Sequence, residues 1–162
     1  MGSLCAMNPY LVKSLEFGPA VLERIVKVIP ATRYDEQTSP DRFTLREAVA
    51  HLADFEPIFR GRMEDALRNP GVTVEPKDEE QMAIDHDYAS QDLIANLNLF
   101  IEERRKTAEL LRGLSPDGFE TPLNHPHLGP LVLEDIANFL LAHDLYHLEH
   151  ASQILEGLAV SA

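Results

Sequence analysis

Four long stretches of helix-favouring sequence constrain this chain more than any other feature. They are expected at about 8–29, 45–68, 91–112 and 133–156, and they do not alternate apolar and polar residues as strands do. This pattern predicts an all-α protein, a four-helix bundle whose functional sites are built from side chains on facing helices. Residues 71–89 are acidic and aperiodic, so we expect a long connection between the second and third helices, which could signal a crossover topology.

Capping and breaking residues set the expected helix ends. Gly18-Pro19 should kink or divide the first helix. In "TLRE", the Thr44 hydroxyl and the Glu47 carboxylate are spaced to satisfy each other's exposed amides as a capping box. Ser90 is expected to cap the third helix. These signals divide the chain into helices of bundle length.

Length, charge and hydropathy limit the class of protein. A chain of 162 residues is long enough for one well-buried core, so residues 1–162 are expected to form a single helical domain. A formal net charge of −13 would repel a phosphate backbone, which argues against nucleic acid as a partner. Neither a bilayer-spanning apolar run nor a signal peptide is present, so we expect a cytoplasmic protein without membrane contact.

The first seven residues, "MGSLCAM", contain the single cysteine, Cys5. This segment is expected to be a disordered leader or a remnant of cloning. One cysteine supports neither a disulfide framework nor a cysteine metal site. Any metal must therefore bind through His, Asp or Glu.

The stretch "HDLYHLEH" at 143–150 concentrates three of the seven histidines in the fourth helix. His143 and His147 lie about 40° apart on the helical wheel, within the apolar stripe, so their side chains can coordinate the same ion. Histidines on such a face are also often buried and bonded to carboxylates or backbone. The HxxxH pattern becomes diagnostic of a metal only with a third ligand.

Two histidines are candidates for the third ligand. His150 lies on the same helix, where three ligands in a row rarely close around a metal. His51 borders the apolar stripe of the second helix and could meet the pair across the bundle. Three imidazoles would leave an open coordination position, which is typical of catalytic sites. Asp54 and Asp144 could orient the ligands or add weak ones, although solvated positions are commoner for such residues.

The other histidines and the arginines carry weaker signals. His86, His125 and His127 lie in the long connections and are expected to be exposed, although the last two could line an entrance. Arg60, Arg62 and the arginines of "ERR" at 103–105 could attract an anionic substrate. On helices this acidic, pairing with Glu and Asp is the expected state.

Three segments resemble the DinB-like family of four-helix metalloenzymes, which includes thiol-dependent S-transferases and maleylpyruvate isomerases. They are "FTLREAVAHLADFEPIFRGRM" at 43–63, "HPHLGPLVLEDI" at 125–136 and "LAHDLYHLEHASQIL" at 141–155. In that family one histidine early in the second helix and an HxxxH pair in the last hold the metal. The resemblance therefore implies His51, His143 and His147 as ligands. One departure is Val132, where relatives often have a capping Thr.

The resemblance implies a metal-dependent enzyme that activates water or a small thiol, as a hydrolase or a thiol S-transferase. The alternative is a non-catalytic helical stress- or damage-response protein with a structural metal or none. Zinc or nickel is favoured as the divalent metal, and iron, manganese or copper would also suit imidazoles. The expected partners are a small-molecule substrate, such as a low-molecular-weight thiol, and a second copy in a homodimer. The sequence positions no general base, and a fourth protein ligand would count against catalysis.

Overall fold

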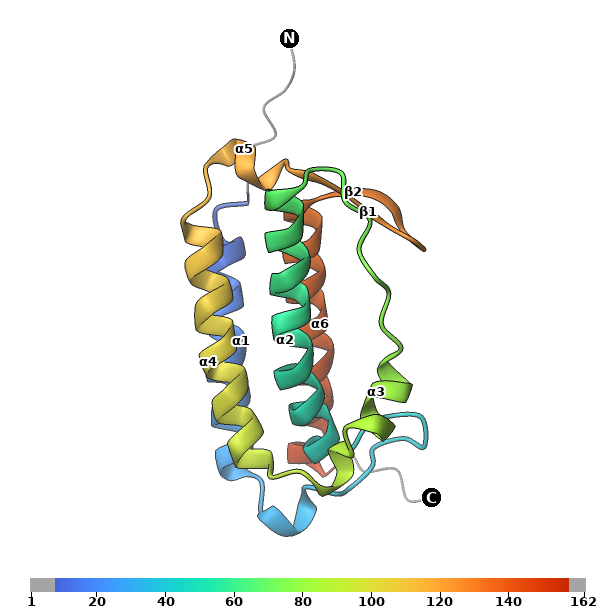
Figure 1. The fold of residues 1–162 in the computed structure, drawn as a ribbon. Helices are drawn as coiled ribbons and strands as arrows, with labels where there is room; N and C mark the ends of the chain where they lie inside the picture. Colours follow the sequence, from blue (N-terminus) through green and yellow to red (C-terminus); the bar gives the residue numbers. More distant parts are fainter. Residues whose placement is uncertain (1–7, 158–162) are drawn as a thin grey trace.

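The computed structural model describes residues 8–157, so the expectations for the first seven residues and Cys5 lie outside the described part. Four long helices form a bundle, as predicted (Figure 1). They are α1 (Leu11–Val28), α2 (Leu45–Arg68), α4 (Leu93–Arg112) and α6 (Leu133–Glu156). None of the helices in this range is long and apolar enough to cross a membrane.

The order of the helices around the bundle explains the long second connection. Helices α1 and α2 each pack against both α4 and α6. Figure 1 shows that the chain runs one way along α1 and α6 and the opposite way along α2 and α4. Because α2 and α4 are parallel neighbours, the chain between them must return along the bundle. The predicted crossover is therefore present.

Most helix ends follow the capping signals, with one correction. The Thr44 hydroxyl accepts the Glu47 N–H at 3.2 Å, and the Glu47 carboxylate accepts the Thr44 N–H at 2.8 Å, so the capping box is confirmed. The prediction for Ser90 was wrong, because the Asp92 carboxylate caps α4 by accepting the Ala95 N–H at 2.7 Å. Ser90 instead ends the short 3₁₀ helix Tyr88–Ser90.

The connections contain short elements that the pattern did not predict. They are the 3₁₀ helix Ala31–Arg33, α3 (Glu79–Asp85), α5 (Pro116–Phe119) and the antiparallel strands β1 (Pro122–His125) and β2 (Gly129–Val132). The hairpin is tied to the second connection, since the Val74 N–H donates to the Asn124 carbonyl at 2.9 Å. At the start of α6, Val132 offers no side-chain cap, and the Asp135 carboxylate accepts its N–H at 2.9 Å.

The core consists of two apolar clusters separated by a layer of buried charge. One cluster includes Leu15, Phe59 and Leu140, and the other includes Leu22, Leu97 and Ile154. Between them, buried side chains from three helices form a charged group that we call the Arg104 hub: Arg104 of α4, Glu56 of α2 and Asp144 of α6. Both carboxylates accept hydrogen bonds from the guanidinium.

The Arg104 hub also reaches α1, at the position where the sequence signalled a break. Pro19 has no N–H to bond the Leu15 carbonyl, and Arg104 Nη1 donates to that carbonyl at 2.9 Å. The helix therefore continues through Gly18-Pro19 without being divided. A Cβ on Gly18 would meet Asp144 Oδ2 at 2.5 Å, so the close approach of α6 requires glycine there. One guanidinium thus contacts all four long helices.

Candidate metal centre

The structure brings together the three histidines selected from the sequence. His51 projects from α2, and His143 and His147 project one turn apart from α6. One ring nitrogen from each lies within 4.8 Å of the others, and the Nε2 atoms of His51 and His143 are 2.8 Å apart. We call these residues the histidine cluster. It lies where α2 faces α6.

Burial keeps the histidine cluster uncharged. It lowers the pKa of His51 to about 3, with repulsion from His143 as a further cause. It lowers the pKa of His143 to about 4, together with the charge of Arg104. It lowers the pKa of His147 to about 2, with repulsion from His143 adding to the effect. All three imidazoles are therefore neutral near pH 7, which is the form that binds metals.

One nitrogen of each clustered imidazole, Nδ1, lacks among the described residues the hydrogen-bond partner that a buried histidine normally has. Within residues 8–157, Nδ1 of His51, of His143 and of His147 is buried without a hydrogen-bond partner. Phe43 and Phe55 flank the His51 ring, with centroids at 5.4 Å and 4.4 Å, and restrict its orientation. Neutral imidazoles that converge without a bonded carboxylate fit a divalent transition metal, for which they are common ligands.

The other candidate ligands do not join the cluster. Asp144 belongs to the Arg104 hub. Asp54 accepts hydrogen bonds from His86 Nδ1 at 2.5 Å and from the Tyr88 hydroxyl at 2.7 Å. His150 lies nearby but outside the cluster. In the described part of the chain, the group of side chains that could hold a metal therefore consists of these three histidines.

A cavity of about 200 Å³ opens beside the cluster. We call it the acidic cavity, because Asp41, Glu79 and Glu80 lie in its wall. Its other lining residues are Arg42, Phe43, His143, Tyr146, His147 and His150. Arg42 is paired with Glu149 at 3.0 Å, so it adds little free positive charge. Small molecules can approach His143 and His147 from this side.

Glu79 is the residue that sequence reasoning missed. It begins α3, and its Oε2 lies 4.0 Å from His51 Nε2. Burial raises the pKa of this carboxyl group above its usual range. The sequence feature that could have indicated α3 is its capping residue Asp78, which accepts the Gln81 N–H at 3.0 Å. However, α3 is too short to give a clear periodic pattern in the sequence.

A second cavity, of about 240 Å³, lies under the β1–β2 hairpin, and His143 is in its wall. We call it the hairpin cavity. Its other lining residues are Phe59, Arg62, His125, Leu128, Ile136 and Phe139. The expectation that His125 lines an entrance agrees with this position, whereas His127 is not in the wall. His143 thus separates two cavities of different character.

Most arginines singled out in the sequence pair with acids, as expected. Arg60 pairs with Glu103 at 2.5 Å, and Arg105 with Glu109 at 2.8 Å. Arg104 is buried in the hub rather than paired on the surface. Arg62 is the exception: among residues 8–157 no carboxylate oxygen lies within 4.0 Å of its guanidinium.

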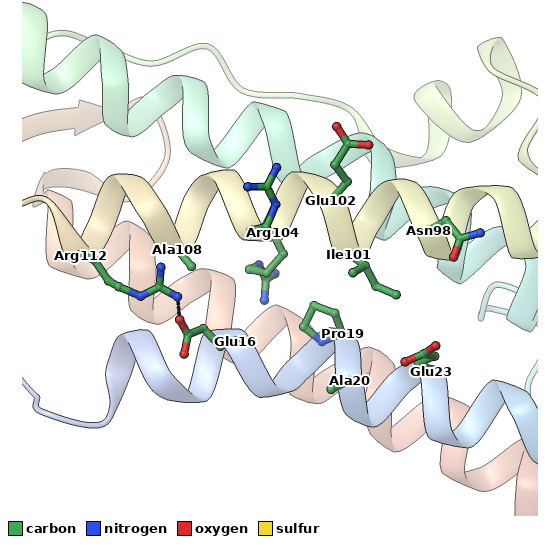
Figure 2. Close-up of a pocket in the computed structure, with 11 residues that line it drawn as sticks. Glu16, Pro19, Ala20, Glu23, Asn98, Ile101, Glu102, Arg104, Ala108 and Arg112 are labelled. Atoms are coloured by element: carbon green, nitrogen blue, oxygen red, sulfur yellow. Dashed lines mark ion pairs between the residues drawn. The ribbon is translucent and has the colours of Figure 1, made fainter.

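A further groove, of about 550 Å³, lies between α1 and α4 (Figure 2). Pro19, Ala20, Ile101 and Ala108 line it, and Arg112 pairs with Glu16 across it. The groove shares no lining residue with the acidic or hairpin cavity and holds none of the clustered histidines. The clustered histidines therefore lie on the opposite side, between α2 and α6.

Comparison with known proteins identifies the family. A model of the DinB superfamily matches residues 14–151. The chain belongs to the DinB superfamily. The resemblance seen in the sequence is thereby confirmed.

Two DinB relatives have names that point to metal-dependent hydrolysis. A provisionally named metal-dependent hydrolase of Oceanobacillus iheyensis is 24% identical over 143 residues, which cover 88% of this chain and 83% of the relative. YfiT of Bacillus subtilis, named in the same way, is 26% identical over 144 residues, which cover 88% and 81%.

Solved structures give the same DinB fold. The structure of YfiT, described as an unusual four-helix bundle, matches with a TM-score of 0.85 at 25% identity and covers 93% of this chain and 87% of YfiT. A mycothiol-dependent maleylpyruvate isomerase matches with a TM-score of 0.73 at 13% identity, covering 100% and 65%. At that identity the second match shows the fold alone.

Proposed function

We propose that this DinB protein is a metal-dependent hydrolase acting on a small-molecule substrate, with His51, His143 and His147 as the metal ligands. The observation that carries the proposal is the convergence of three neutral imidazoles from two helices, those of His51 and His147 buried and that of His143 half-buried, with no fourth side chain in the same group among residues 8–157. Zinc or nickel is the favoured ion. When bound, such an ion supplies Lewis acidity and lowers the pKa of a water molecule, making a nucleophile available near pH 7. The names of the relatives support this reaction class.

The residues around the cluster supply positioning and proton transfer. Glu79 is the carboxylate beside the cluster, and its Oε2 is placed to take a proton from the nucleophile. His150 lines the acidic cavity, and its Nε2 is buried without a hydrogen-bond partner among residues 8–157. The Phe43 and Phe55 rings pack against the His51 ring and limit its contact with water.

Transfer to a low-molecular-weight thiol stays as the alternative activity, since the same site could activate a thiol instead of water. A structural metal without catalysis stays as the alternative from another class. A homodimer also remains a prediction, which light scattering of the purified protein can check. Hydrolysis, thiol transfer and a structural metal differ in the group that would be exchanged at the histidine cluster, which is water, a thiol or none.

Elemental analysis of the protein purified without an affinity tag tests the metal proposal. A stoichiometric transition metal is expected in the wild type, lost in His51→Ala and His147→Ala, and kept in His127→Ala, whose histidine is exposed in the hairpin turn. Circular dichroism must show equal helicity. A wild type that takes up no metal even after reconstitution would overturn the proposal.

Activity assays then separate the reaction classes. The metal-loaded protein is incubated with a panel of 4-nitrophenyl esters and, separately, with cysteine and 1-chloro-2,4-dinitrobenzene. Ester hydrolysis that disappears in His147→Ala is the expected result. Thiol conjugation alone would favour the transferase. Stoichiometric metal with neither activity would favour the non-catalytic alternative.

A further inference from the structure

The walls of the hairpin cavity are mainly apolar. Phe59 and Ile136 form its buried part. Leu128 and Phe139 stand at its edge and are 55% and 41% exposed. Exposed large apolar side chains around a hollow are typical of surfaces that bind apolar groups. The shape of this wall therefore suits an aromatic or branched aliphatic group.

One positive charge, that of Arg62, lines the hairpin cavity and is influenced by the charge of Glu79, but among residues 8–157 no carboxylate is close enough to form an ion pair with it. The Arg62 guanidinium lies over the Phe59 ring, 5.6 Å from its centroid, and Nη2 donates to the Glu75 carbonyl at 2.9 Å. Its Nε is buried and has no acceptor within the described residues. Arginine stays protonated at neutral pH even though burial lowers its pKa. Nη1 also has no acceptor within the described residues, and a guanidinium with a free terminal donor beside an apolar wall is suited to a carboxylate.

The opposite cavity has the reverse polarity. Asp41, Glu79 and Glu80 line the acidic cavity, and Arg42 there is already paired. An anionic group would be repelled on that side and attracted on the side of Arg62. Because His143 is in the wall of both cavities, a molecule bound under the hairpin can reach the histidine cluster. The two cavities therefore orient an asymmetric substrate.

We propose that the hairpin cavity is a substrate subsite for an aromatic or branched apolar group that carries a carboxylate, with the carboxylate on Arg62 and the reactive bond toward His143. A cavity of about 240 Å³ is smaller than the roughly 300–1,000 Å³ of sites that enclose a whole drug-sized ligand, so it holds one part of the substrate. The placement of the substrate's reactive bond toward His143 rests on the proposed function. Binding of the apolar acid does not, because it requires no metal.

The test uses the metal-free full-length protein and two probes that differ in charge, 4-phenylbutanoate and 4-phenylbutanamide. Binding is followed by isothermal titration calorimetry and by chemical-shift changes. The acid is expected to bind about tenfold or more tightly than the amide, because a hydrogen bond to a charged group is worth more than a neutral one. Arg62→Gln should remove that preference while leaving the amide unaffected.

Two further variants test the apolar wall. Leu128→Ser and Phe139→Ser replace exposed side chains, so the fold should persist, and both probes should bind several-fold more weakly. The matched control is Leu145→Ser, which changes a 66% exposed leucine of α6 outside the cavity and should leave binding unchanged. Shifts centred on the groove between α1 and α4, equal binding of acid and amide, or an unaltered preference in Arg62→Gln would overturn the subsite.

The outcome is separable from that of the metal proposal. If the probes bind as expected but the protein takes up no zinc, the subsite stands and the hydrolase proposal fails. If zinc binds but the probes do not, the subsite fails and the metal centre stands. The use of metal-free protein keeps the two results distinct, since the carboxylate probe could itself bind a zinc ion that has an open coordination position.

Discussion

Replacing Gly18 with alanine should destabilise the protein, although the same change usually stabilises a helix. Alanine in a helix interior is favoured over glycine by about 1 kcal/mol. At Gly18 the added Cβ would lie 2.5 Å from Asp144 Oδ2 and 3.4 Å from Arg104 Nη1. Something must shift, and the atoms in the way belong to the buried Arg104 hub.

The size of the effect follows from what the shift disrupts. Removing one partner of a buried ion pair costs about 3–5 kcal/mol, because the remaining charge stays buried without compensation. Subtracting the helix-propensity gain leaves a loss of roughly 2–4 kcal/mol. This is a large fraction of the about 5–15 kcal/mol that stabilises a typical domain.

Urea denaturation followed by circular dichroism at 222 nm measures the loss. Gly61→Ala is the matched control, since Gly61 lies inside α2 and a Cβ added there would have no neighbouring atom within 4 Å. That variant should gain about 0.5–1 kcal/mol. If Gly18→Ala gains stability like Gly61→Ala, the close approach of α6 to α1 has been misjudged and the reasoning fails.

A double-mutant cycle separates the clash from the effect of Pro19. A residue before proline avoids helical angles when it has a Cβ, so alanine at this position carries a cost unrelated to Asp144. In an Asp144→Ala background the clash is absent. Gly18→Ala should therefore cost much less in that background than in the wild type. An equal cost in both would assign the effect to Pro19.

Further changes test the cluster and the fold. Zinc at a concentration of about a hundred times its Kd should raise the free energy of unfolding by about 2.7 kcal/mol and Tm by roughly 5–10 °C. Calorimetry should show that His147→Ala abolishes this shift in Tm. Glu79→Gln should keep zinc affinity but lower ester hydrolysis about a hundredfold, whereas Glu80→Gln should retain it; equal rates would remove Glu79 from proton transfer. Thr44→Ala should cost about 1 kcal/mol in urea denaturation by removing the capping bond, and an unchanged midpoint would contradict this.

The histidine cluster was accessible to sequence reasoning because its geometry is local or periodic. His143 and His147 lie one turn apart on any α-helix, and the apolar stripe sets the direction in which they point. His51 could be placed against them because it borders the apolar stripe of the second helix, and the family resemblance selected the same residue. What the sequence could not test is whether the cluster holds a metal, since histidines on an apolar face also occur without one.

The structure within the second connection and the hairpin could not be predicted, because it depends on contacts between residues that are distant in the sequence. Thr73 bridges to Asn124, and the Asn124 side chain donates to the Gly71 carbonyl at 2.9 Å. These partners lie about fifty positions apart, and no local pattern encodes them. The position of Glu79 above His51 depends on the same connection, which is why no carboxylate could be assigned a role beforehand.

The buried arginine was missed for a different reason. In "ERR" Arg104 looks like a surface residue, since charged side chains are rarely buried. Its environment is created by three other helices: Glu56, Asp144 and the carbonyl that Pro19 leaves free. Asp144 was expected near the metal or in solvent, because it follows His143 in the sequence. Successive side chains are rotated by about 100° around the helix axis, so Asp144 points in a different direction from His143.

The Arg104 hub limits which arrangements of the four helices are possible. If the helices were arranged in another order, or if one helix were shifted along its axis by a turn, the two carboxylates of the hub and the Leu15 carbonyl would be buried without the hydrogen bonds that Arg104 donates to them. Each such error costs several kcal/mol, whereas exchanging one leucine contact for another costs little. Apolar clusters above and below could tolerate a shifted register. A single guanidinium therefore selects one topology from the several that the apolar pattern alone would permit.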